Sequence, residues 1–288
     1  MAMTERTNQP RILVAGCGKL GGAIASRLST TATVFGMRRN PDQVPAGVEG
    51  VKADLMDSDG LRKAVPDNLD VIVYCLTPAS YDEDGYRNAY VTGLTNLLAA
   101  HGGRPLTRLV FISSTSVYAQ DDDSWVDETS PAEPRRFSGE QILAGEQTAL
   151  DSGHPATVVR FSGIYGPTRQ RFLEEVIAGR MAPTKPAPFT NRIHENDAAA
   201  AVEHLILKAL AGERLEPLYL ASDSGPARLD EVVEWVQSQV ACAPPKNDAR
   251  TGGRAGSKRC NNQRLRDSGF DFQYPDFRAG YSAMIADR

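Results

Sequence analysis

The chain has 288 residues and a mass of 31.2 kDa, enough for one large domain or for one domain with a small lobe. Hydrophobic residues make up 41% and charged residues 24%, a balance that excludes a largely disordered or fibrous protein. The net charge of −4 gives no electrostatic case for a nucleic-acid partner, and no apolar run approaches the roughly 20 residues that a membrane span needs. We therefore expect a globular protein that binds a small-molecule substrate, with neither nucleic acid nor membrane as a partner.

Residues 1–10 are polar and lack the apolar core of a signal peptide, so we expect a short leader before the first strand and a cytoplasmic location. The four cysteines are scattered without the spacing of metal ligands, which favours free thiols over a disulfide framework or a metal site. They are Cys17, Cys75, Cys242 and Cys260.

Short β-branched runs alternate with helical patterns along most of the chain. The predicted strands are residues 11–15, 33–35, 70–75, 108–113 and 156–161. The predicted helices are residues 20–28, 58–65, 86–100, 141–150 and 197–211. Because the strands look apolar on both faces, the pattern predicts an α/β fold with a doubly wound Rossmann-type parallel sheet covered by helices on both sides.

Beyond Gly166 several prolines interrupt this alternation and frame one helix at residues 172–179. A strand at 218–221, a helix at 230–240 and a basic stretch at 246–266 follow. We expect a Rossmann domain of residues 1–170 and 191–225 and a small discontinuous substrate lobe of 171–190 and 226–288. The basic stretch is either a solvated loop or a surface that receives an anionic ligand.

The first predicted strand runs directly into the turn Gly16-Cys17-Gly18-Lys19-Leu20-Gly21 and then into a helix. The first glycine permits the tight turn, the second lets the backbone approach a pyrophosphate, and the third allows close packing of helix on strand. The free N–H groups at the helix N-terminus favour an anion. The turn therefore predicts a bound dinucleotide; the alternative is a merely tight strand-to-helix turn.

The second strand leads into Arg38 and Arg39, where an NAD site commonly has an acidic residue for the ribose hydroxyl. Two guanidinium groups suit the 2′-phosphate of NADP, so NADP(H) is favoured, with NAD as the alternative. Asp54, followed by Leu55 after the third strand, is placed to contact the adenine or simply to cap the next turn.

Further motifs accompany the glycine turn. They are Ala53-Asp-Leu-Met-Asp57, Tyr90-Val-Thr-Gly-Leu-Thr-Asn-Leu-Leu-Ala99, Phe111-Ile-Ser-Ser-Thr-Ser-Val-Tyr118, Arg160-Phe-Ser-Gly-Ile-Tyr-Gly-Pro167 and Ile193-His-Glu-Asn-Asp-Ala-Ala199. With them the chain resembles the extended short-chain dehydrogenase/reductase superfamily, of the NAD-dependent epimerase/dehydratase type, over nearly its whole length. The Gly-x-Gly-x-x-Gly pattern is similar to that of an atypical subgroup.

The resemblance implies roles for several residues. Ser114 falls at the family's catalytic Ser/Thr, Thr77 and Pro78 lie on a loop near the cofactor, and Ser113 and Gln141 are further cofactor contacts. Residues 164–167 line the nicotinamide side. The resemblance also implies a homodimer that pairs through the helices at residues 86–100 and 141–150.

The family's Tyr-x-x-x-Lys pair, however, is replaced by Phe137 and Gln141. Neither a phenyl ring nor a carboxamide transfers a proton near neutral pH, so another group must supply it. Tyr165 and His194 are the candidates for this role, with Ser114 as a substrate or oxyanion contact and Glu140 more distant. Tyr165 also has a structural interpretation as a ring that packs beside the nicotinamide. His194 has one as a hydrogen-bonded residue at the end of a strand.

Arg171 and Arg192 are candidates for binding a carboxylate or phosphate of the substrate, or for forming surface ion pairs. Two hypotheses about function follow. The first is an NADP(H)-dependent oxidoreductase or epimerase/dehydratase that lacks the usual Tyr/Lys pair, and the second is a non-catalytic sensor or regulatory protein that binds the dinucleotide.

Overall fold

The computed structural model describes residues 9–252 and 256–288. These residues contain a parallel sheet of seven strands in the order β11-β7-β5-β4-β1-β2-β3. The strands are β1 (Arg11–Ala15), β2 (Thr33–Arg38), β3 (Glu49–Lys52), β4 (Val71–Tyr74), β5 (Arg108–Ser114), β7 (Ala156–Phe161) and β11 (Leu218–Ala221). Since β1 stands where the strand order reverses, the predicted α/β fold with a doubly wound sheet is confirmed.

The chain separates into two compact units. Unit 1 contains the residues up to Ile112 with Ala144–Val158 and Val202–Pro217, and unit 2 contains Ser113–Leu143, Val159–Ala201 and Leu218–Arg288. Helices α5 (Phe137–Leu150) and α7 (Glu195–Leu210) contribute to both units. The division into a sheet domain and a lobe at the boundaries expected from the sequence stays a prediction.

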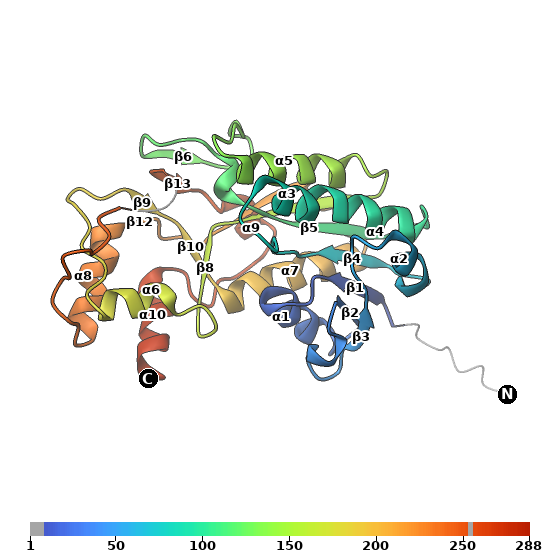
Figure 1. Ribbon diagram of the computed structural model, residues 1–288, viewed down its shortest axis with the longest axis horizontal. Coiled ribbons are helices and arrows are strands. Elements are labelled where there is room, and N and C mark those ends of the chain that lie inside the picture. The colour runs from blue at the N-terminus through green and yellow to red at the C-terminus, as the bar shows by residue number, and fades with distance from the viewer. Residues whose placement is uncertain (1–8, 253–255) are drawn as a thin grey trace. The chain divides into compact units, whose positions relative to one another are not determined.

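Unit 1 begins with the strand, turn and helix that the sequence predicts. In Figure 1, α1 (Lys19–Leu28) lies beside β1 and β2 at the blue end of the chain. The buried side chains of Leu20, Ile24 and Leu28 recur every four residues, which gives this helix one apolar face against the sheet. Helix α2 (Ser58–Ala64) starts at Asp57, whose side chain accepts a hydrogen bond from Gly60 N at 3.0 Å.

The helix expected at residues 86–100 is interrupted. It consists of α3 (Glu83–Arg87), a π-helical turn at Asn88–Thr92 and α4 (Gly93–His101). The buried hydroxyl of Tyr74 donates to the carbonyl oxygen of Ala89 at 2.6 Å and thereby satisfies a backbone group within that turn. The helix expected at these residues is therefore present, and the sequence did not predict its π-helical turn.

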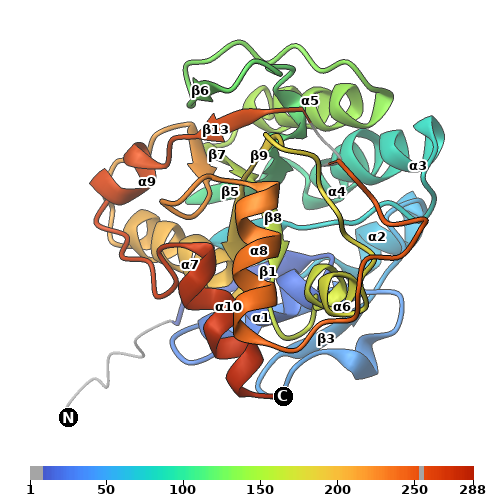
Figure 2. The same ribbon diagram turned by 90° about the vertical axis from the view of Figure 1, so that its left-hand side faces the viewer.

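Unit 2 has a helical layer that the sequence predicts only in part. Helix α6 (Arg171–Ile177) and helix α8 (Leu229–Gln239) were expected, whereas α10 (Phe277–Ala286) was missed. Figure 2 shows α8 and α10 side by side. These three helices share a hydrophobic core that includes Val176, Val233 and Phe277.

Three two-stranded ribbons in unit 2 were also not predicted. They pair β8 (Gly163–Tyr165) with β10 (Arg192–His194), β9 (Phe189–Thr190) with β12 (Ala227–Arg228), and β6 (Ser124–Val126) with β13 (Lys258–Cys260). Each strand has only two or three residues, too few for an alternating pattern to be recognised.

The basic stretch at residues 246–266 is not simply a solvated loop. It contains β13 and most of helix α9 (Gln263–Asp267), and the side chain of Lys258 is buried. Arg254 lies outside the described residues. Among the helices of the described segments, none has the length and apolar character that crossing a bilayer requires.

Candidate functional site

The glycine turn of unit 1 is fixed by backbone hydrogen bonds to the neighbouring strand. The N–H groups of Gly16 and Cys17 both donate to the carbonyl oxygen of Met37 at 3.1 Å, and Gly18 N donates to Gly16 O at 2.7 Å. Gly16 has a φ of +91°, in the region that favours glycine. Gly18 is then the N-cap of α1 and has no side chain to occupy the helix N-terminus.

The three glycines of the motif meet different surroundings. A β-carbon on Gly16 would overlap the carbonyl group of Cys75, and one on Gly21 would overlap the carbonyl oxygen of Gly16. A β-carbon on Gly18 would meet only Gly16 O, at 4.0 Å. Gly16 and Gly21 are thus required by the packing of the turn, whereas Gly18 leaves space above the backbone at a helix N-terminus. This arrangement fits the pyrophosphate of a dinucleotide.

The arginine pair lies at the edge of this turn. Arg38 donates from Nη1 to the carbonyl oxygens of Cys17 and Gln43, each at 3.0 Å, and from Nη2 to Gln43 Oε1. Three of its roughly five N–H donors are therefore engaged within the protein, and the remaining ones have no acceptor among the described residues. Arg39 is exposed. The guanidinium of Arg38 is therefore held against the glycine turn, whereas Arg39 is open to solvent.

The other predicted cofactor contacts of unit 1 lie on the loops that follow β3 and β4. Asp54 accepts a hydrogen bond from Met56 N at 2.9 Å, so it caps the turn after β3 while its side chain stays exposed. The carbonyl of Leu55 accepts from Asn96 Nδ2 at 2.8 Å. Thr77 and Pro78 follow Leu76, whose side chain lies beside Gly16. This loop and the glycine turn are therefore neighbours.

In unit 2, Ser114 and the first turn of α5 lie together. Ser114 Oγ accepts a hydrogen bond from Ser116 N at 3.1 Å, and Ser113 before it is buried. A β-carbon on Gly139 would come within 2.8 Å of Ser116 O, so the start of α5 packs directly on this segment. Phe137 and Gln141, each half-buried, flank Gly139 on the same helix. The start of α5, with Phe137 and Gln141, therefore packs on the segment Ser114–Ser116, and these are the positions to which the resemblance assigns the family's catalytic groups.

Tyr165, a candidate proton donor, is buried in the core that α6, α8 and α10 share. Its hydroxyl lies against Gly280 and has no hydrogen-bond partner among the described residues. Burial raises the pKa of this hydroxyl, and the Asp223 carboxylate raises it further. A buried phenol with a raised pKa is a poor proton donor, so this geometry gives no support to Tyr165 as the acid.

His194, the second candidate, stands at the end of β10 between two aromatic rings. Its ring centre is 3.9 Å from that of Tyr274 and 5.3 Å from that of Tyr165, which meets it edge-on. Nδ1 accepts a hydrogen bond from Asn196 N at 3.2 Å, so the other nitrogen, Nε2, carries the proton in the neutral ring. Burial lowers the pKa of His194, although the nearby Asp197 and Glu195 oppose this.

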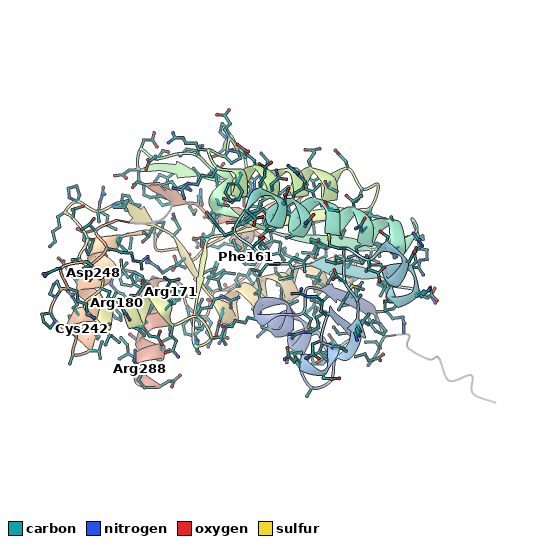
Figure 3. The ribbon with its side chains drawn as sticks, viewed as in Figure 1. Phe161, Arg171, Arg180, Cys242, Asp248 and Arg288 are labelled. Atoms are coloured by element: carbon teal, nitrogen blue, oxygen red, sulfur yellow. The ribbon has the colours of Figure 1, made fainter. Side chains whose placement is uncertain are left out.

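The two arginines expected to bind substrate have different surroundings. Arg171 begins α6 (Figure 3), is exposed, and donates from Nε to Glu175 Oε1 at 2.9 Å. Arg192 is buried, donates from Nη2 to Thr190 Oγ1 at 2.5 Å, and lies over the ring of Phe277. Its Nη1 is buried without a partner among the described residues. Arg171 therefore forms an ion pair, whereas Arg192 keeps an unused donor.

Asp223 and Lys258 are among the buried ionisable residues of unit 2 that the sequence reasoning did not single out. Asp223 follows β11, and burial raises its pKa to about 8 against the opposing effect of Arg192. A polar residue just beyond a predicted parallel strand was a signal that could have identified it. Lys258 is buried within β13, and no sequence pattern separates it from the exposed basic residues around it.

An open glycine turn at the centre of a doubly wound sheet defines the class of Rossmann proteins that bind a nicotinamide dinucleotide. Residues 12–222 match the model of the NAD-dependent epimerase/dehydratase family, and the chain belongs to this family. It is an NAD(P)-dependent enzyme of the oxidoreductase or epimerase kind.

Two known structures are similar over almost the whole chain. One is a protein of Methylobacillus flagellatus that is itself assigned by resemblance as an NAD-dependent epimerase/dehydratase, with 35% identity, a TM-score of 0.82 and coverage of 98% of this chain and 99% of that one. The other is dTDP-glucose 4,6-dehydratase from Bacillus anthracis in complex with NAD, with 18% identity, a TM-score of 0.78 and coverage of 96% of each chain. The second likeness concerns the fold alone.

Among curated proteins, the 2-alkyl-3-oxoalkanoate reductase of Shewanella oneidensis is 26% identical over 203 residues. The match covers 64% of this chain and 52% of the relative, so the chain matches about half the length of that reductase.

Proposed function

We propose that this protein is an NADP(H)-dependent reductase that transfers hydride to the carbonyl carbon of a small oxo acid. The observation that carries the proposal is the open backbone at Gly18 beside Arg38 and Arg39. The open helix N-terminus at Gly18 is suited to a pyrophosphate, and the neighbouring guanidinium groups are suited to a phosphate on the adenosine ribose. When bound, the nicotinamide ring supplies the hydride.

The replacement of the Tyr/Lys pair favours reduction over epimerisation or dehydration. Oxidising an alcohol near neutral pH requires a base for the hydroxyl proton, and neither Phe137 nor Gln141 titrates in that range. Reducing a carbonyl produces a strongly basic alkoxide, which takes a proton from water. A site with a hydrogen-bonding serine and no titrating tyrosine can therefore support reduction with water as the proton source.

Ser114 is proposed to hold the substrate carbonyl through its hydroxyl. The proposal is supported by the hydrogen bond from Ser116 N, which orients Ser114 Oγ so that its proton is available to an acceptor. The oxo-acid class is proposed from the reductase of Shewanella oneidensis, whose name states a 3-oxo acid as substrate. His194 remains a second candidate for handling the proton, since its Nε2 carries one in the neutral state.

For the cofactor, we propose that Arg39 contacts the 2′-phosphate and that Arg38 forms the wall beside it. Asp54, Leu55, Thr77, Pro78, Ser113 and Gln141 are proposed as the remaining cofactor contacts. A homodimer through the segments at residues 86–100 and 141–150 is proposed from the family resemblance; a monomer by light scattering at micromolar concentration would contradict it.

The test combines cofactor binding with turnover. NADPH binding is measured by nicotinamide fluorescence, and oxidation of bound NADPH is then followed with a series of short 3-oxo acids. The expected result is oxidation that falls by at least about 100-fold in Ser114→Ala, while the matched change Ser116→Ala has little effect. NADPH binding without oxidation by any carbonyl compound would favour the non-catalytic alternative, and absence of binding would overturn the whole proposal.

A further inference from the structure

Residues 166–169 of unit 2 form a tight loop around the carboxylate of one residue, Glu195. Figure 1 shows β8 and β10 side by side, and in this parallel ribbon Tyr165 stands opposite His194. The next residue after each strand is Gly166 in one chain segment and Glu195, the first residue of α7, in the other. The register of the ribbon therefore brings the start of the loop against the Glu195 side chain.

The carboxylate of Glu195 receives three hydrogen bonds from two consecutive residues of the loop. Thr168 donates from its backbone N–H to Oε1 at 2.9 Å and from Oγ1 to Oε2 at 2.5 Å. Arg169 donates from Nη1 to Oε2 at 3.1 Å. Glu195 is only 9% exposed, and burying a carboxylate is strongly unfavourable unless its oxygens are hydrogen-bonded in this way. The loop and the carboxylate therefore hold each other in place.

Gly166 shows that the loop is shaped around this side chain. Its φ is +151°, in the region that favours glycine, and a β-carbon there would lie 2.5 Å from Cγ of Glu195. The backbone of Gly166 also pairs with that of Arg169, whose N–H donates to the Gly166 carbonyl oxygen at 2.8 Å. A glycine, a backbone pairing and a buried carboxylate thus fix one conformation of the loop.

The loop follows β8, which comes directly after β7 at the carboxyl end of that strand. In a doubly wound sheet, dinucleotides bind beyond the carboxyl ends of the strands and cross the sheet where the strand order reverses, here at β1. Arg38 and Arg39 stand at the end of β2, so the proposed adenosine half of the cofactor lies over β1, β2 and β3. The nicotinamide half is then expected to extend toward β4, β5 and β7, which stand on the other side of β1 in the strand order.

We propose that Glu195 is a positioning residue that holds residues 166–169 in the conformation that receives the nicotinamide half of the cofactor. This inference rests on the proposed binding of NADP(H). A loop that is fixed before binding does not have to be ordered by the ligand, so the entropy cost of ordering it does not weaken the affinity. Glu195 acts through Thr168 and Arg169 and not by contact with the cofactor.

The experiment compares NADPH with adenosine 2′,5′-bisphosphate, which carries the 2′-phosphate but lacks the nicotinamide half. Binding of both is measured by calorimetry to the unaltered protein and to Glu195→Ala, Glu195→Gln and Glu174→Gln, the last being an exposed glutamate of α6 in the same unit. Glu195→Ala is expected to bind NADPH about ten-fold or more weakly. It should bind the bisphosphate within about two-fold of normal.

The two remaining variants are expected to differ from Glu195→Ala. Glu195→Gln should lose less affinity for NADPH, because its amide oxygen still accepts from Thr168 N, and Glu174→Gln should lose none. Thermal unfolding of each variant is recorded in parallel. If Glu195→Ala does not fold, Thr168→Val takes its place in the same comparison, because it removes only the hydrogen bond from Oγ1; a smaller loss, for NADPH alone, is then expected.

Two results would overturn the inference. Equal losses for NADPH and the bisphosphate in Glu195→Ala would mean that the carboxylate supports only the general fold, and no loss for either would mean that the loop does not contribute to binding. Failure of the unaltered protein to bind either ligand would overturn the proposed function and this inference with it. Normal binding without turnover would contradict the proposed reductase activity alone.

Discussion

Arg38 donates a hydrogen bond from Nη1 to the carbonyl oxygen of Cys17 at 3.0 Å and so joins the end of β2 to the glycine turn. This contact uses a residue that the sequence alone assigns to the cofactor phosphate. Arg39, which is exposed, is the freer of the two cations.

Replacing Arg39 is therefore expected to affect NADPH selectively. Arg39→Ala should weaken NADPH binding by about 10- to 100-fold and leave NADH binding nearly unchanged, because only NADPH has the 2′-phosphate. Arg38→Ala should weaken both cofactors, since it also loosens the turn. Fluorescence titration with each cofactor measures this, with Arg62→Ala, an exposed arginine of the same unit, as the control. Equal losses for both cofactors in Arg39→Ala would contradict the assignment.

Substitutions at two glycines of the turn are expected to have different effects, one on the stability of the protein and the other on NADPH binding. Gly21→Ala places a methyl group against Gly16 O and should lower the free energy of unfolding by about 1 to 3 kcal/mol. Gly18→Ala meets open space and should fold almost normally, yet bind NADPH weakly because the methyl group occupies the pyrophosphate position. Urea unfolding and cofactor titration of both variants provide the measurement. A Gly18→Ala variant with normal affinity would place the pyrophosphate elsewhere.

Restoring the family's pair is expected to create activity in the oxidative direction. Phe137→Tyr with Gln141→Lys introduces a hydroxyl whose pKa the new ammonium lowers, and it should raise alcohol oxidation at about pH 8 to 9 by at least about ten-fold. Phe137→Tyr alone should give much less. The rate of NADP reduction with the hydroxy-acid product is the readout. No gain in the double variant would mean that the start of α5 does not face the reacting carbon.

His194 is expected to make the protein sensitive to acid. Its folded-state pKa lies below the ordinary value of 6.5, so between these two values the unfolded chain binds more protons than the folded one. Above pH 6.5 the ring is neutral in the folded and the unfolded chain, so its contribution to stability is fully present. This contribution is lost as the pH falls toward the folded-state pKa. Urea unfolding at about pH 7.5, 6 and 5 should give a steeper loss in the unaltered protein than in His194→Gln. Parallel curves would refute this.

Tyr165 is expected to be a core residue and not the acid. Tyr165→Phe removes a buried hydroxyl that lacks a partner, so stability should be unchanged or higher and kcat should stay within about two-fold. Gly280→Ala places a methyl group against that hydroxyl and should lower the free energy of unfolding by about 1 to 3 kcal/mol. Tyr165→Phe in the same chain should recover part of this loss. A large fall in kcat in Tyr165→Phe would restore it as the proton donor.

Much of the fold could be predicted from the sequence because its signals are local. The strands Arg11–Ala15, Ala156–Phe161 and Leu218–Ala221 were predicted with their exact bounds, since a strand buried on both faces is a continuous apolar run between turn residues. The short ribbons of unit 2 were not predicted, because strands of two or three residues exist only through the partners beside them. Within the π-helical turn at Asn88–Thr92, the carbonyl oxygen of Ala89 likewise accepts a hydrogen bond from a residue distant in the chain, Tyr74.

The sequence by itself determined the glycine turn, the arginine pair after β2 and the presence of Phe137 and Gln141 where the family resemblance places a Tyr/Lys pair. Each of these features consists of residues close together in the chain. The chemical nature of their side chains alone shows which roles they can have. Only the tertiary structure decided that Tyr165 lies against Gly280 and that Asp223 and Arg192 are buried. Burial and hydrogen bonding depend on segments that are distant in the chain. They determine whether a polar group is exposed to solvent, hydrogen-bonded within the protein or available to a ligand.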